Sequence, residues 1–306
     1  MNINSSVTFA LDSTVGMLAK LVLQYIESGE LSERFAAFDK TEVEFGKGFE
    51  IDVVLAATKQ SAGTKAAEHG TYAPTVMSLA FDTPTGGQYA VTMDEQRVLE
   101  CVGDVAAQQQ YAAELTESLY QGWIDDKNAA VAAECAKIIA QSAKSGGTVT
   151  LGADVDAYAQ EVLRQLKTVV EDIREGYTGT EYGNTAVGSK RIAARDVAIV
   201  MSNALAATLD VNGYAKVFSP EYLQMVNVIR ITSARIEEGT VLITDARNIQ
   251  VRRKYERLVG PIQNSDGSYN MFYNKYDYIS AAIGASGTYA NVVAFPFYVI
   301  KTTEAS

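Results

Sequence analysis

The side chains that could do chemistry in this sequence are few and far apart. His69 is the only histidine of the chain, which excludes a multi-histidine metal site. It lies in the turn-rich stretch "EHGTYAP", which is typical of a solvated loop residue rather than of the base of a triad. Cys101 and Cys135 lack CxxC spacing and are expected to be reduced, partly buried thiols rather than a disulfide.

Three short stretches approach known site motifs and miss them. "GNTAVGSK" at 183–190 reverses the Lys and Ser of a phosphate-binding loop, so the Lys cannot reach the outer phosphates. "GASG" at 284–287 is one residue short of a nucleophile elbow. "NSDGSYN" at 264–270 lacks the acid spacing of a calcium loop and favours a hairpin turn. We therefore predict no catalytic, cofactor-binding or metal-binding residues, and a structural or binding role.

Charge is distributed unevenly along the chain. The formal net charge is −11 and the isoelectric point is about 4.7, which argues against a dedicated nucleic-acid binder. Within the strand-like stretch 239–260, however, residues 247–257 carry five cations and one acid, Glu256; the cations are Arg247, Arg252, Arg253, Lys254 and Arg257. We call this segment the basic ribbon. Residues 27–52 carry the opposite excess, namely Glu27, Glu30, Glu33, Asp39, Glu42, Glu44, Glu50 and Asp52 against Arg34, Lys40 and Lys47.

The first half of the chain predicts two helices and an extended region. Capping residues and apolar spacing predict a helix over 13–27. Strict alternation predicts a strand over 40–57, and a second strand follows at 86–93. The roughly 28 residues between them form either a surface loop or a two-stranded arm that reaches a neighbour. The Ala-rich segment 104–143 predicts a helix against a sheet, which spans roughly 60 Å unless Gly122 breaks it.

The second half predicts one more helix and a β-rich end. The helix covers about 153–175, between the punctuating "GGTVTLG" and a loop over 175–190. From 196 onward we expect a buried strand "DVAIVMS", two short helices that each begin at a Ser, and a hairpin "ARIEEGTVLITD". Three further strands follow, and Phe272, Tyr273, Tyr276 and Tyr278 are expected to pack in them rather than to stack on bases. The closing strand "YANVVAFPFYVIK" is expected to join a sheet set up early in the chain.

This order of elements resembles the major capsid protein of tailed bacteriophages, an α+β Hong Kong 97-type fold that encapsulins share. The local matches are "DVAIVMSNALAATLDVNGYAKVF", "IEEGTVLITDARNIQVRRKYERLVG" and "SYNMFYNKYDYISAAIGASGTYANVVAFPF". The resemblance implies five parts: an N-terminal arm (1–37), an extended β-hairpin loop (38–93), a peripheral domain with a long spine helix (94–150), an axial domain (151–285), and a return strand to the peripheral domain (286–306).

The resemblance also implies a function. The chain would be a virion structural protein without enzyme activity, which assembles in the bacterial host cytoplasm into hexamers and pentamers of an icosahedral shell around double-stranded DNA. Its expected partners are further copies of itself, a portal and a separate scaffolding protein, with neither membrane nor sequence-specific DNA binding. The alternatives are an encapsulin-like compartment shell and, from another class, a cytosolic enzyme or small-molecule binder that uses the Gly-rich loop at 176–190. Lys47, Lys59 and Lys65 offer no assignable partner for an isopeptide crosslink.

In such a shell, the basic ribbon has three candidate partners: the acidic stretch of a neighbouring copy, acids of its own subunit, or packaged DNA. Contacts between copies are favoured because identical subunits that each carry one acidic and one basic segment can pair head to tail and close into rings. Arg suits this role because its planar fork binds a carboxylate through two hydrogen bonds. The candidate interface residues are Glu42, Glu44, Lys47, Glu50, Arg247, Arg252, Arg253, Lys254 and Arg257.

Overall fold

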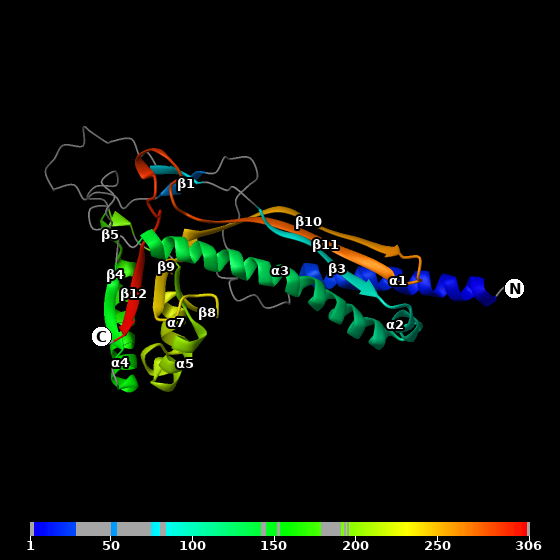
Figure 1. Ribbon diagram of the computed structural model, residues 1–306, viewed down its shortest axis with the longest axis horizontal. Coiled ribbons are helices and arrows are strands. Elements are labelled where there is room, and N and C mark those ends of the chain that lie inside the picture. The colour runs from blue at the N-terminus through cyan, green and yellow to red at the C-terminus, as the bar shows by residue number, and fades with distance from the viewer. Residues whose placement is uncertain are drawn as a thin grey trace. The chain divides into compact units, whose positions relative to one another are not determined.

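The chain divides into two compact units, which are described separately (Figure 1). The computed structural model describes residues 3–28, 50–53, 75–79, 84–141, 145–151, 154–178, 191–192, 194 and 196–304. Unit 1 comprises Met1–Glu33, Thr83–Ala130 and Arg252–Tyr278, and unit 2 comprises Arg34–Asp82, Val131–Val251 and Ile279–Ser306. Each unit is therefore assembled from segments that lie far apart in the sequence.

Unit 1 combines helices with a three-stranded antiparallel sheet of order β10-β11-β3. The strands are β3 (Thr85–Met93), β10 (Ile249–Gln263) and β11 (Tyr269–Ala281), and the helices are α1 (Ile3–Ser28), α2 (Glu95–Glu100) and the first part of α3 (Val105–Gln141). The helix predicted over 13–27 is confirmed and begins earlier. The turn predicted over 264–270 is confirmed, and it joins β10 to β11 with Gly267 at φ +88°.

Helix α3 is continuous, so the predicted long helix is confirmed and Gly122 does not break it. Its 37 residues correspond to about 55 Å. A Cβ atom on Gly122 would lie 2.7 Å from Cδ1 of Tyr89, because the Tyr89 ring packs directly on the helix backbone. The apolar side chains that face the sheet are buried from Ala112 to Trp123, whereas Val105 at the start of the helix is 62% exposed. The helix lies against the sheet as predicted, with the rings of Tyr120 and Tyr273 6.4 Å apart.

Unit 2 is built on a five-stranded mixed sheet of order β4-β12-β9-β7-β8. Its strands are β4 (Ser145–Leu151), β7 (Val197–Met201), β8 (Val228–Thr232), β9 (Thr240–Asp245) and β12 (Phe297–Glu304). Every residue of β7 and β9 is buried, as expected for the fully apolar run "VAIVM". The sheet therefore forms the centre of this unit.

Four helices lie wholly within the described part of unit 2, and two of them begin at the predicted Ser caps. They are α4 (Val155–Glu175), α5 (Asn203–Val211), α6 (Tyr214–Val217) and α7 (Pro220–Val226). Ser202 accepts a hydrogen bond from the amide of Leu205, and Ser219 accepts one from the amide of Tyr222, so both predicted Ser caps are confirmed. One face of α4 is buried from Tyr158 to Ile173, whereas Val155 at the start of the helix is half exposed.

Three strand predictions for unit 2 are wrong. "GGTVTLG" does not merely punctuate the chain, because most of it lies in β4, parallel to β12. Residues 234–245 form no hairpin, because β9 pairs with β7 and β12. The last strand starts only at Phe297, directly after Pro296, which has no amide hydrogen to donate. Its partners are β4, in the middle of the chain, and β9, late in the chain, rather than strands of an early sheet.

The remaining described strands are short. β1 (Glu50–Val53) pairs with β2 (Thr75–Ser78), and β5 (Tyr177–Thr178) pairs with β6 (Arg191–Ile192). The strand predicted over 86–93 is confirmed as β3, and its described partner is β11. Most of the alternating stretch 40–57, His69, the loop residues 183–190, and Lys47, Lys59 and Lys65 lie outside the described residues. The five-part division of the chain stays a prediction.

Candidate assembly interface

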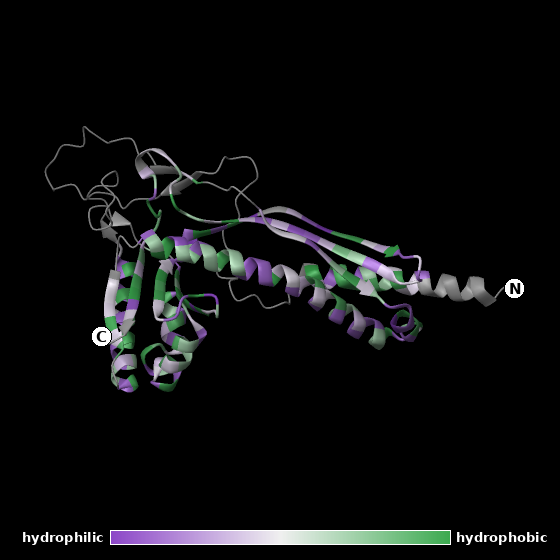
Figure 2. Cartoon of the chain, in the orientation of Figure 1, coloured by the Kyte–Doolittle hydropathy of each residue, from purple (hydrophilic) through white to green (hydrophobic). Residues whose placement is uncertain are grey.

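The structure places four of the five ribbon cations on one strand. Arg252, Arg253, Lys254 and Arg257 lie on β10 within unit 1. Arg247 lies in unit 2, in the 3-10 turn η2 (Ala246–Asn248) that precedes β10. The predicted strand "NIQVRRKYERLVG" is thus confirmed and is longer than expected. Hydrophilic stretches, purple in Figure 2, lie along β10 and β11.

Arg247 is bound within its own subunit. Its Nε and Nη2 atoms donate to the two carboxylate oxygens of Asp245 at 2.9 and 2.7 Å, and its guanidinium lies 4.1 Å from the centre of the Phe295 ring. Asp245 also accepts the Arg247 amide and is fully buried. For Arg247 the structure therefore shows one of the three candidate contacts of the ribbon, a salt bridge to an acid of its own subunit.

The other ribbon cations differ in how far solvent reaches them. Arg252 is partly buried, and this burial lowers the pKa of its guanidinium. Arg257 is exposed. The side chains of Arg253 and Lys254 lie outside the described part of the structure. Arg257 is thus the described ribbon cation on β10 that a partner can approach most directly.

The only acid of the ribbon is bound to the neighbouring strand β11. Glu256 accepts a hydrogen bond from the Tyr273 hydroxyl at 2.7 Å and an ion-paired one from Lys275 at 3.0 Å. Lys275 also lies 3.6 Å from Asp277 and 5.5 Å from the centre of the Trp123 ring. Burial, reinforced by the hydrogen bond to Glu256, raises the pKa of Tyr273 well above its ordinary value. We call Glu256, Tyr273, Lys275 and Asp277 the buried polar cluster.

This cluster was not predicted from the sequence, although the sequence contains one signal of it. In "YNKYDY" the alternation of a strand places Tyr273, Lys275 and Asp277 on one face, and all three are buried. A Lys and an Asp on the buried face of a strand require polar partners, and Glu256 on the paired segment supplies one. Because Glu256 is already bound to Lys275 and Tyr273, most of its negative charge is not available to the neighbouring cations of β10.

The acidic half of the predicted interface has no described side chains. Glu42, Glu44 and Lys47 lie outside the described residues, and Glu50 is described only by its backbone in β1. The structure therefore neither brings these acids to the ribbon nor separates them from it. Their pairing with the ribbon of a neighbouring copy stays a proposal.

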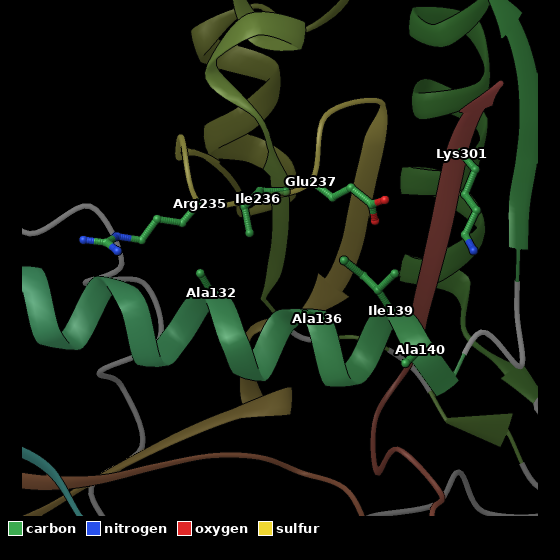
Figure 3. A pocket seen from close by; sticks show the side chains of 8 residues that line it. All are labelled: Ala132, Ala136, Ile139, Ala140, Arg235, Ile236, Glu237 and Lys301. Atoms are coloured by element: carbon green, nitrogen blue, oxygen red, sulfur yellow. The ribbon is translucent and has the colours of Figure 1, made fainter. Parts of the chain in front are cut away.

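The hollows of unit 2 offer little chemistry. One of them, with a volume of about 280 Å³, lies between the end of α3 and residues 235–237. Apolar side chains and three exposed ionic ones line it (Figure 3).

Among the described residues, no group of His, Cys, Asp and Glu could hold a metal ion, and no helix could span a membrane. Cys101 and Cys135 are buried thiols as predicted, and burial raises the pKa of Cys135 to about 12, so it stays protonated and unreactive.

Solved structures with a similar fold include the capsids of bacteriophages. The capsid of Staphylococcus phage Andhra matches with a TM-score of 0.56 and 10% identity, over 89% of this chain and 85% of that one. The head of the Helicobacter pylori bacteriophage KHP40 matches with a TM-score of 0.50 and 9% identity, over 83% of each chain. A virus-like particle from Pyrococcus furiosus gives a TM-score of 0.46 at 13% identity, over 94% of this chain and 99% of that one. The likenesses to the capsid of phage Andhra and to the head of bacteriophage KHP40 show a Hong Kong 97-type capsid fold for the chain.

Sequence comparison assigns the family. The profile of the Phi29-like phage major capsid protein family matches residues 16–295, which is most of the chain. The chain belongs to this family: it is a capsid shell protein of the virion, and thus a structural protein rather than an enzyme. A comparison with curated proteins found no sequence match. The predicted resemblance to tailed-phage capsid proteins is confirmed.

Proposed function

We propose that this chain assembles into hexamers and pentamers of an icosahedral shell that encloses double-stranded DNA, and that the basic ribbon aligns neighbouring copies. Membership of a phage major capsid protein family supports the shell. The observation that supports the role of the ribbon is the state of its charges. Glu256 is bound to Lys275 and Tyr273, whereas Arg257 is exposed on the same strand.

The ion pairs of this arrangement would align neighbouring copies rather than supply most of the binding free energy. An exposed ion pair contributes only about 0.2 to 1 kcal/mol, so apolar burial and the repetition of contacts around a ring must supply most of the binding. Charge instead selects which faces of two copies meet, because like charges brought together are unfavourable. The acidic stretch at 27–52 and the cations of β10 give each copy one segment of each sign.

Packaged DNA is not the preferred partner of the ribbon. A protein of net charge −11 repels a polyanion over most of its surface, which favours loose enclosure of DNA without sequence recognition. A portal and a separate scaffolding protein complete the expected set of partners. The runner-up function is a bacterial compartment shell of the same fold, but the profile that matches the sequence is that of a phage major capsid protein family.

Reversal of one exposed ribbon charge tests the proposal. Arg257→Glu should leave a folded, soluble subunit and reduce the yield of particles seen by negative-stain microscopy at least about tenfold, since every copy in the shell carries the reversal. Arg235→Glu is the matched control, because Arg235 is also exposed but lies outside the ribbon. It should assemble normally.

Two further measurements separate the explanations for a loss of assembly. Circular dichroism of the variant subunit must match that of the parent protein, which excludes unfolding. Addition of Glu42→Arg and Glu44→Arg to Arg257→Glu should restore particles if the acidic stretch is the partner. Normal particles from Arg257→Glu alone would rule out the role of the ribbon, and parent protein that remains monomeric even with the expected scaffolding protein present would rule out the shell.

A further inference from the structure

The three-stranded sheet of unit 1 has two outer strands, and they differ in how they are protected. Among the described residues the order is β10-β11-β3, so β10 and β3 each leave one edge without a described partner strand. An outer strand exposes a row of amide and carbonyl groups that can pair with another chain, and proteins normally block such edges with charges, proline, bulges or short length. β10 uses two of these means, four cations and Pro261.

β3 uses none of them. Its sequence, "TGGQYAVTM", contains no charged residue and no proline, and its nine residues exceed the typical strand length of about five or six. Gln88, Ala90 and Thr92 are exposed, so its outward face carries small or neutral side chains. The strand offers a long, uncharged edge for backbone pairing.

The other described outer strands are protected. In the five-stranded sheet, β8 is only five residues long and carries Arg230, which is paired with Asp210. β4 has a shift of register against β12 next to Gly147, whose φ is +145°. β1 and β2 have four residues each. β3 is therefore exceptional among the described outer strands.

Packing against α3 and β11 holds β3 in a fixed, extended form. Nine consecutive residue pairs join it to β11 without interruption, from Thr85 opposite Asp277 to Met93 opposite Tyr269. The Tyr89 hydroxyl donates to Asp126 of α3 at 2.5 Å, and Met93 is fully buried. At Gly86 a Cβ atom would lie 2.1 Å from the Lys275 carbonyl oxygen, so the backbones approach as closely as glycine allows. An edge that is already ordered loses little conformational entropy on pairing.

We propose that the outer edge of β3 pairs with a strand of a second copy of this chain, so that the sheet continues from one subunit into the next. The proposal rests on the proposed function, because the assembly of a shell brings copies together at a fixed spacing. Along a strand, alternate residues direct their amide and carbonyl groups toward the same edge. About half of the nine residues of β3 therefore direct these groups toward its outer edge. The absence of charge on β3 matters here, since each copy carries a formal charge of −11 and most surfaces of two copies repel each other.

Hydrogen exchange of assembled particles and of isolated subunits tests this pairing directly. Outward amides of 85–93 should exchange at least about tenfold more slowly in particles than in subunits, because pairing adds a hydrogen bond to each. Amides of the central strand β11 serve as the internal control and should be protected in both states. Equal exchange of β3 in both states, whether fast or already slow in the subunit, would overturn the proposal.

Edge-blocking variants give an independent readout. Gln88→Lys and Ala90→Lys each place a charge on an exposed position of β3, the means by which β10 is protected. Each should leave the subunit folded and reduce particle yield by at least about tenfold at equal protein concentration. The matched control is Gln109→Lys, an exposed position of α3, which should assemble like the parent. Particles of normal yield from both β3 variants would contradict the pairing, whereas failure of the unaltered protein to form particles would instead contradict the proposed function.

Discussion

The two larger sheets of this protein differ in how completely their two faces are buried. In unit 2, β7 and β9 are buried at every position, so both faces of the five-stranded sheet are covered. In unit 1, β11 alternates strictly between buried and half-buried residues, so only one face of the three-stranded sheet is fully covered. The first pattern is that of a self-sufficient core, and the second that of a sheet with one wet face.

The chemistry of the buried positions differs as well. The central strands of unit 2 bury aliphatic side chains such as Ile199, Val200 and Leu242. The covered face of β11 buries Tyr273, Lys275 and Asp277 beside Trp123, together with the partly buried Glu256. An apolar core is stable by itself, whereas a buried ionic cluster depends on complete pairing. We infer that unit 2 supplies most of the stability of the subunit, and that unit 1 presents its open face and edge to other copies.

The largest expected effect tests the apolar core. Leu242→Ala should lower the free energy of unfolding by about 2 to 5 kcal/mol, because Leu242 is fully buried and the cavity cannot collapse between two covered faces. Ile262→Ala is the control on the other sheet: Ile262 is 49% exposed, and its loss should cost less than about 0.5 kcal/mol. Urea denaturation of subunits provides the measurement. Comparable losses in the two variants would contradict the contrast between the sheets.

A smaller effect is expected from the buried polar cluster. Lys275→Met should destabilise unit 1 by about 1 to 3 kcal/mol, because Glu256 and Asp277 then lose their shared cation while Asp277 remains buried. Lys301→Met, which removes an exposed cation from β12, should be nearly neutral. If the cluster acts as a unit, Glu256→Gln should cost less in the Lys275→Met background than in the parent. Additive costs in this double-mutant cycle would show that the two residues do not interact.

Sequence patterns were sufficient where one local rule decided the outcome. The fully apolar run "VAIVM", the Ser caps of α5 and α7, and the Asp-Gly turn between β10 and β11 all predicted the elements that the structure contains. They also predicted the basic ribbon as a strand. In each case the necessary interaction lies within a few residues, so neighbouring sequence alone specifies it.

Patterns failed where pairing between distant segments decided the outcome. "SGGTVTL" has two glycines and resembles a connection, yet it becomes β4 because β12 supplies a parallel partner about 150 residues later. The hairpin expected at 234–245 failed because β9 pairs with β7 and β12. The polar cluster was missed because Glu256 meets Lys275 across a hairpin, and composition alone does not reveal that register.

Substitution of Gly122 should give the smallest change in stability, and the sign of that change should depend on the residue at position 89. In the middle of a helix, Gly→Ala normally stabilises by about 0.5 to 1 kcal/mol. In α3 the new methyl group would lie 2.7 Å from the Tyr89 ring, so Gly122→Ala should instead destabilise unit 1 by about 1 kcal/mol. In a Tyr89→Ala background the obstruction is gone, and the same substitution should become stabilising. Thermal denaturation of the four proteins of this cycle measures the sign. If Gly122→Ala instead stabilises the parent protein, the packing of Tyr89 on α3 does not require this glycine. The side chains that cover the sheet of unit 1 would then be less tightly packed than those that cover the sheet of unit 2.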